Sequence, residues 1–207
     1  MRYWVALIFA VAAFGQKYEV GADIGYGWYN NGTIFSPAGS IQAGIRNRFA
    51  AGIDLADEFS EYVSAQFAYL YHDGHPFFQG MGVKTDIQGN SDALTMELLF
   101  HFAKRDRRLR PFVAGGSGAK EYVIAGPAPF PQPLPQVAAL TTNDVWKVVF
   151  SVGGGVTYLL RPHMLLRAEF RDYLTTFDRQ EIVPAPHNTA RGLFEQFTPL
   201  FGLSYTF

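Results

Sequence analysis

Residues 199–207, PLFGLSYTF, bring the chain to its end on an alternating run whose last residue is Phe207. Terminal segments usually fray into polar residues, because a segment that buries nothing cannot offset the entropy that it loses on ordering. An aromatic residue at the end of a strand-like pattern therefore predicts that this end is buried, paired with another strand or recognised by a partner.

The same period of two residues recurs along the chain. In residues 18–28, YEVGADIGYGW, every second residue from Tyr18 to Trp28 is apolar, and the residues between them are glycine or acidic. Each such segment is near the ~9–11 residues that a tilted strand needs to cross a bilayer. The pattern predicts eight strands, at residues 18–28, 41–55, 61–71, 93–102, 111–122, 146–158, 165–173 and 195–207.

The connections between these predicted strands alternate in length. The long ones follow the first, third, fifth and seventh strands, at residues 30–40, 73–91, 124–145 and 175–193. The short ones are residues 57–60, 103–110 and 160–164. An up-and-down barrel sorts its loops in this way when one rim faces the cell exterior and the other faces the periplasm. We therefore predict an all-β fold, an eight-stranded antiparallel up-and-down transmembrane β-barrel.

The first residues and the composition agree with an exported barrel. Residues 1–15, MRYWVALIFAVAAFG, have one basic residue, then an apolar core, then small residues, which is the order of a secretory signal peptide. The barrel domain is then expected at residues 16–207. The chain has no cysteine, which excludes a disulfide framework and thiolate metal sites. Its formal net charge is −1 without a long basic stripe, so no nucleic-acid partner is expected.

The residues Gly202, Tyr205 and Phe207 carry a resemblance to a known family. A glycine, an aromatic residue three positions later and a terminal aromatic residue form the C-terminal signature of bacterial outer-membrane β-barrel proteins. With its signal peptide and eight predicted strands, the chain resembles the small barrels of the OmpA/OmpX type. The resemblance implies that the barrel assembly machinery recognises the last strand, which then pairs with the first strand. It also implies a place in the Gram-negative outer membrane, in contact with lipids and lipopolysaccharide.

The polar face of the predicted strands carries one group of charged residues. Arg167, Glu169 and Arg171 share one strand, and Glu97 and His101 share another. Unpaired buried charge is costly, so we expect these side chains to pair inside the barrel and fill it. The sequence supplies no activated nucleophile, and its histidines lack the spacing of metal ligands. No enzymatic activity, cofactor or metal is therefore expected.

The long loops are expected to carry the specific function, which is a structural or surface-interaction role. Residues 75–82, HPFFQGMG, are expected to expose Phe77, Phe78 and Met81, and exposed aromatic residues on loops can mark contact with an extracellular ligand. The sequence does not identify that ligand. Two alternatives stay open: an outer-membrane enzyme that acylates or deacylates lipid A, and a soluble periplasmic barrel that binds a small apolar ligand inside.

Overall fold

The computed structural model describes residues 17–36, 39–124, 138–140, 144–176, 182–185, 189–190 and 193–207. Within these ranges, no helix is long and apolar enough to cross a membrane. The predicted signal peptide at residues 1–15 lies outside the described residues.

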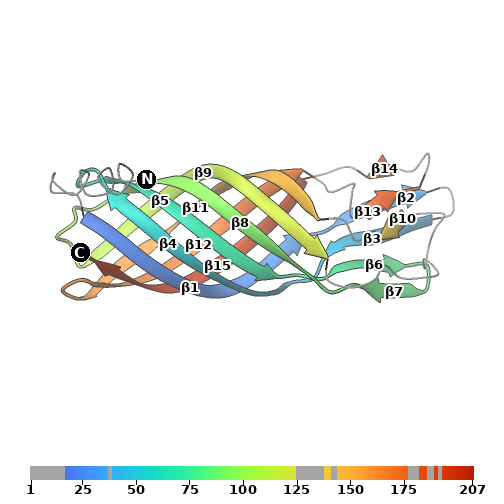
Figure 1. Cartoon of the computed structure of the whole chain (residues 1–207), viewed down its shortest axis with the longest axis horizontal. Coiled ribbons are helices and arrows are strands. Elements are labelled where there is room, and N and C mark those ends of the chain that lie inside the picture. The colour runs from blue at the N-terminus through green and yellow to red at the C-terminus, as the bar shows by residue number, and fades with distance from the viewer. Residues whose placement is uncertain are drawn as a thin grey trace, which may run out of the picture.

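Eight long strands close into one antiparallel barrel (Figure 1). Each strand pairs with the one before it and the one after it among these eight, and the first pairs with the last to close the ring. The predicted all-β, up-and-down fold is therefore confirmed. The strands are β1 (Lys17–Asn30), β4 (Arg48–Glu58), β5 (Val63–Asp73), β8 (Gly89–His101), β9 (Leu109–Ile124), β11 (Val145–Arg161), β12 (Met164–Thr176) and β15 (Leu193–Thr206).

The period of two residues gives every barrel strand an outer and an inner face. Large apolar side chains such as Ile24, Ile53 and Phe150 are exposed on the outer face. The inner face carries glycine, small residues and buried polar side chains. A closed barrel leaves no unpaired strand edge, so it is the one kind of sheet that can span lipid. The outward apolar face argues against the soluble barrel, in which that face would point inward.

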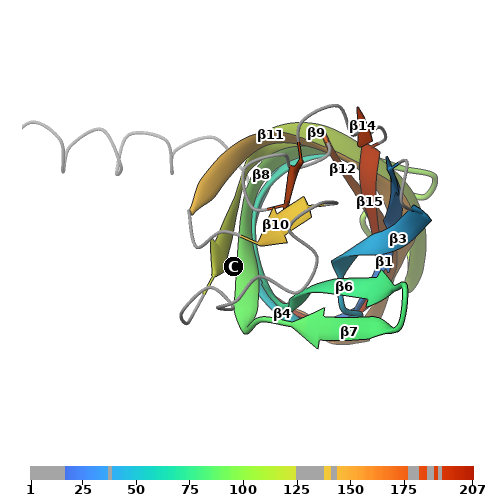
Figure 2. The ribbon, with the colours of Figure 1, turned by 90° about the vertical axis from the view of Figure 1, so that its right-hand side faces the viewer.

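Further sheets project from one end of the barrel, opposite the end that holds the N and C labels (Figure 1). A five-stranded sheet has the order β14-β2-β3-β6-β7, and β10 (Ala138–Leu140) pairs with β13 (Ile182–Pro184). We call these sheets the extension. Viewed along the barrel axis, β3, β6 and β7 lie over part of the barrel wall (Figure 2). The strands of the larger sheet are β2 (Gly32–Ser36), β3 (Gly39–Ile45), β6 (Pro76–Gly80), β7 (Val83–Asp86) and β14 (Thr189–Ala190).

The prediction of one strand at residues 41–55 is wrong, because two strands, β3 and β4, occupy this segment. Two asparagine side chains lie at the junction between them. Oδ1 of Asn31 accepts a hydrogen bond from the backbone N of Ile45 at 2.9 Å, and Oδ1 of Asn47 accepts one from the backbone N of Tyr29 at 2.9 Å. The wall of the barrel ends here and the extension begins. The apolar residues of β3 are consequently buried in the extension instead of facing outward: Ile41, Ala43 and Ile45.

Candidate functional site

Arg171 on β12 lies inside the barrel and is almost fully buried. Its Nη1 lies 2.6 Å from Oε2 of Glu97 on β8, and its Nη2 donates to Oε2 of Glu169 at 3.1 Å. Strands β8 and β12 are not neighbours in the barrel. The contact with Glu97 therefore crosses the interior and joins two strands that β9 and β11 separate in the wall.

Arg167 on the same strand holds a second group of partners. Its Nη2 donates to Oε1 of Glu19 at 3.0 Å, and its Nη1 donates to Oε1 of Gln66 at 3.0 Å. The same Nη1 lies 3.4 Å from Oδ1 of Asp54 and 4.0 Å from Oε2 of Glu169. Glu169 therefore contacts both arginines and joins the two groups.

We call this assembly the central ion cluster; its members are Glu19, Asp54, Glu97, Arg167, Glu169 and Arg171. The ring of Phe112 lies beside both guanidinium groups, with each guanidinium carbon 5.8 Å from the ring centroid. Positive charge is attracted to the face of an aromatic ring. The buried arginines are thus paired and packed, as buried charges must be.

His101 lies apart from the central ion cluster. Its Nε2 is 2.9 Å from Oγ of Ser64, and its ring centroid is 5.7 Å from that of Phe112. The other ring nitrogen, Nδ1, has no hydrogen-bond partner among the described residues, so this pair lacks the third group of a catalytic triad. The structure thus brings four of the five predicted interior residues together and places His101 elsewhere. Across the described residues, no three His, Cys, Asp or Glu side chains are grouped to hold a metal.

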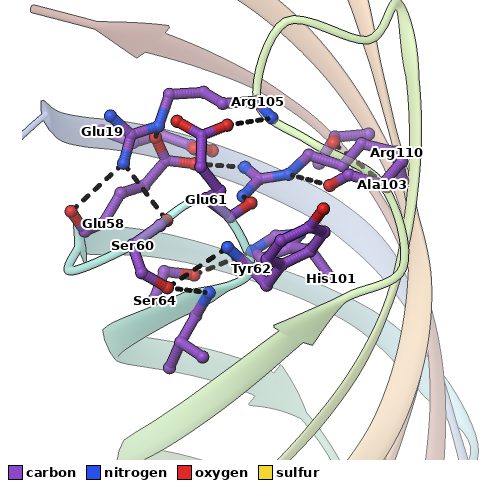
Figure 3. A network of polar contacts seen from close by, with 12 residues as sticks. Glu19, Glu58, Ser60, Glu61, Tyr62, Ser64, His101, Ala103, Arg105 and Arg110 are labelled. Atoms are coloured by element: carbon purple, nitrogen blue, oxygen red, sulfur yellow. Dashed lines mark hydrogen bonds and ion pairs between the residues drawn. The ribbon is translucent and has the colours of Figure 1, made fainter.

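A further polar network lies at the end of the barrel with the short turns (Figure 3). Nε of Arg105 lies 2.5 Å from Oε2 of Glu58, and Nη1 of Arg110 pairs with Oε1 of the same carboxylate. Nη2 of Arg105 donates to the backbone oxygens of Glu58 and Ser60, each at 3.3 Å, and Nη2 of Arg110 donates to that of Glu61 at 2.8 Å. This rim network ties the β4–β5 turn to the β8–β9 turn.

A layer of apolar side chains fills the barrel on the other side of the central ion cluster. Along β5 the buried Leu70 lies between Gln66 and His72, and along β12 the buried Tyr173 lies between Arg171 and Thr175. The layer therefore separates two polar regions of the interior. Its members, which we call the apolar layer, are Ala50, Leu70, Ala93, Val149, Tyr173 and Leu200.

The second polar region, toward the extension, is built around Tyr29 and Lys120. Nζ of Lys120 donates to the hydroxyl of Tyr29 at 3.2 Å and to Oε1 of Gln196. The Tyr29 hydroxyl also lies 3.1 Å from Oγ of Ser91 and 3.3 Å from Nδ1 of His72. These side chains are all buried, so the interior is packed here too.

The prediction of the interior missed Lys120 and the rim network. A signal for two of these residues was present, because Arg110 and Lys120 share the even numbering of Phe112 and so lie on the inner face of β9. The glycines in this segment weakened the alternation. No pattern in the sequence indicates that Arg105 reaches from its turn to Glu58, since that contact depends on how two turns meet in space.

The last strand is paired on both sides. Gly202 faces inward, where a Cβ atom would lie 1.9 Å from Oδ1 of Asp23, and Tyr205 and Phe207 are exposed on the outer face. The backbone N of Phe207 donates to the oxygen of Tyr18 at 3.0 Å, and the N of Tyr18 donates to the oxygen of Phe207 at 3.3 Å. Recognition of these residues by the assembly machinery stays a prediction.

The expectation that Phe77 and Phe78 are exposed is wrong. They are 4% and 0% exposed, because the connection that carries them folds into the extension with its own apolar core. Phe78 pairs with Ala43 of β3, and the guanidinium carbon of Arg46 lies 4.0 Å from the ring centroid of Phe77. Met81, in the turn between β6 and β7, is exposed as expected.

Several solved structures share this fold, and they are outer-membrane proteins. A major outer membrane protein from Thermus thermophilus has a TM-score of 0.58 and 12% identity, over 93% of this chain and 100% of that one. OprG from Pseudomonas aeruginosa has a TM-score of 0.57 and 12% identity, over 93% and 96%. Neisserial surface protein A has a TM-score of 0.56 and 13% identity, over 92% and 97%. Identity at this level shows a shared fold alone.

Comparison with protein-family models gives no match, and neither does comparison with curated proteins.

The closed barrel, its apolar outer face and its fold define the class of protein. The chain is a membrane-spanning, eight-stranded β-barrel of the outer-membrane kind. Its fold is that of the small barrels that the C-terminal signature indicates, and its location is the outer membrane. Outer-membrane barrels have their short turns on the periplasmic side, which predicts that the rim network lies at the periplasmic end and the extension on the extracellular side.

Proposed function

We propose that this protein is a sealed outer-membrane barrel with a structural or surface-interaction role, which it performs through its extracellular extension. The observation that carries the proposal is the filled interior. Two polar regions and the apolar layer between them occupy the barrel, so we assign the surface role to the extension and not to the interior.

The packing of the interior opposes a role in solute passage. An eight-stranded barrel has an interior just wide enough for side chains to fill. Here the central ion cluster spans it between β8 and β12, and the apolar layer follows. An ion that crossed the apolar layer would lose its water without gaining polar partners, which is costly.

The extension supports a surface role. Its buried core includes Ile34 and Phe78, which hold the sheet in shape, whereas Phe35 and Met81 are exposed. Exposed apolar side chains on an ordered scaffold are typical of contact sites. The partners that we propose are outer-membrane lipids and lipopolysaccharide around the barrel, and an unidentified extracellular ligand at the extension.

A lipid A-modifying activity is the rival function, and the geometry does not favour it. Acyl transfer or deacylation needs a nucleophile and a base that reach the lipid. The pair of Ser64 and His101 faces the interior and is buried. We therefore propose that the protein is not an enzyme.

Two measurements test the proposal. The purified barrel in a planar lipid bilayer should give no conductance steps, and stable steps would show an open pore.

Cells that display the protein should adhere to hexadecane droplets more than cells that display the Phe35→Ser/Met81→Ser variant, at equal amounts of folded barrel. Equal adherence would contradict a surface role for these two residues.

A further inference from the structure

A cavity of about 310 Å³ lies at the end of the barrel with the short turns, which we expect to face the periplasm. We call it the periplasmic pocket. Its charged lining comes from the rim network and the β8–β9 turn, and its apolar lining includes Leu159 and Leu165. The ion pairs, hydrogen bonds and apolar packing described above do not explain why this end of the barrel holds an open cavity. The charged lining residues are Glu58, Arg105, Asp106, Arg107 and Arg110.

The balance of charge in this lining favours an anion. Arg105 and Arg110 both pair with the one carboxylate of Glu58, so two positive charges meet a single negative charge. Arg107 adds a further positive charge and Asp106 a further negative one. The lining as a whole therefore carries more positive than negative charge.

Two of these arginines, Arg105 and Arg107, also have nitrogen donors outside the rim network. The contacts of Arg105 in the rim network use its Nε and Nη2 and leave Nη1 unused. The guanidinium of Arg107 makes no hydrogen bond or ion pair with any described residue. Guanidinium groups present several N–H donors in a plane, a geometry that matches phosphate and carboxylate oxygens.

The pocket is held in shape by contacts that an anion would not have to create. Nε of Arg110 donates to the backbone oxygen of Ala103 at 3.2 Å, and its Nη2 donates to that of Glu61. Across the pocket, the backbone N of Thr206 donates to the oxygen of His163 at 2.9 Å. Because these groups are already ordered, binding costs conformational entropy mainly at the exposed side chain of Arg107.

We propose that the periplasmic pocket binds a small anionic group, a phosphate or a carboxylate, through Arg107 together with the Arg105–Arg110 pair. The group enters from the periplasm, either free in solution or on a lipid headgroup of the inner leaflet. This site is independent of the proposed surface role, because the extension lies at the other end of the barrel.

The test uses the full chain, folded in micelles of a nonionic detergent and titrated with inorganic phosphate in a calorimeter. We expect saturable binding to the unmodified protein. Replacing Arg107 with Gln should weaken it by roughly tenfold to a hundredfold, the usual effect of losing a hydrogen bond to a charged group. Arg107 takes no part in the described side-chain contacts, so the variant should fold, and its shift in gel mobility on heating checks this.

Arg108→Gln is the matched control, because it removes the same charge from the same turn. Arg108 is not part of the pocket lining, and its guanidinium carbon lies 5.0 Å from the ring centroid of Tyr158. If phosphate binds in the periplasmic pocket, the Arg108→Gln variant should bind it with the affinity of the unmodified protein. Absence of saturable binding, or equal weakening by both substitutions, would overturn the proposal.

A second titration distinguishes the two sources of the anion. It is repeated in micelles that contain phosphatidylglycerol. If the lipid headgroup occupies the pocket, the apparent affinity for phosphate falls in the unmodified protein, which supports the site with a lipid ligand. If the affinity is unchanged, the site is supported with a soluble ligand.

Discussion

Nη1 of Arg171 and Oε2 of Glu97 lie 2.6 Å apart inside the barrel, and each side chain is 1% exposed. The two residues come from strands that are not neighbours, so their ion pair braces the wall across the interior. A buried charge that loses its partner is strongly destabilising, because nothing then offsets its loss of water.

Replacing Arg171 with Met should therefore destabilise the barrel by about 3–5 kcal/mol, since Glu97 and Glu169 would lose their shared partner. The urea midpoint of the barrel in lipid vesicles, followed by gel mobility without heating, measures the change. Adding Glu97→Gln to this variant should recover part of the loss. The exposed Lys104 is the control, and Lys104→Met should leave the midpoint unchanged. An unchanged midpoint for Arg171→Met would show that the pair does not brace the barrel.

The apolar layer gives a second prediction, which compares one truncation on the two faces of the wall. Leu70 is 4% exposed inside the barrel, and Leu94 is 41% exposed on the outer face. Leu70→Ala should cost about 2–5 kcal/mol of unfolding free energy, because the packed interior cannot collapse around the cavity. Leu94→Ala should cost less, because lipid chains fill the space. Equal losses in urea unfolding would mean that the layer is loosely packed.

Alternation in the sequence was enough to predict the barrel and most of the central ion cluster. Since successive side chains of a strand point to opposite faces, the numbering of Arg167, Glu169 and Arg171 places all three on one face. Burial of that face then requires acidic and basic partners to meet. Which strand supplies the partner depends on the order of strands around the barrel, which an up-and-down topology fixes.

The same alternation could not predict the extension. The apolar residues of β3 and β4 have the same odd numbering, yet Ile45 points inward and Phe49 points outward. The side-chain direction reverses at Arg46 and Asn47. The apolar residues keep their odd numbering on both sides of this point, so the alternation does not indicate the reversal. Phe77 and Phe78 are buried by pairing between connections far apart in the sequence, so their burial depends on contacts that local pattern does not contain.

Two adjacent glycines of β9 give a third prediction. A Cβ atom on Gly116 would lie 2.0 Å from the backbone oxygen of Met96, whereas one on Gly115 would have its nearest neighbour, the backbone oxygen of Ser151, at 3.8 Å. Gly116→Ala should destabilise the barrel by about 1–3 kcal/mol, the usual cost of overpacking. Gly115→Ala should be neutral or stabilising by ~0.5–1 kcal/mol, because alanine restricts the unfolded chain. Urea unfolding of the two variants side by side measures both effects, and the opposite order would refute this close approach of β9 to β8.

The turn between β11 and β12 holds His163 at a φ of 69°, a conformation that favours glycine. Two contacts with the last strand accompany it: Nδ1 donates to the backbone oxygen of Thr206 at 2.8 Å, and the ring stacks on Tyr205. His163→Ala loses these contacts and keeps the backbone strain, whereas His163→Gly loses the contacts and the strain. The glycine variant should therefore be more stable than the alanine variant by about 1 kcal/mol. An alanine variant at least as stable in urea would show that the turn carries no such strain.

The C-terminal signature can be tested with two phenylalanines, because Phe201 of β15 and Phe207, which directly follows this strand, are both 64% exposed. Truncating either to Ala removes a similar apolar surface from contact with lipid, so the two changes should have similar effects on the folded barrel. If the assembly machinery reads the last residue, Phe207→Ala alone should sharply reduce the heat-shifting form recovered from the outer-membrane fraction. Refolding of both purified variants into lipid vesicles, where no machinery is present, is the control and should be equally efficient. Equal yields in cells would assign Phe207 a role in lipid contact alone.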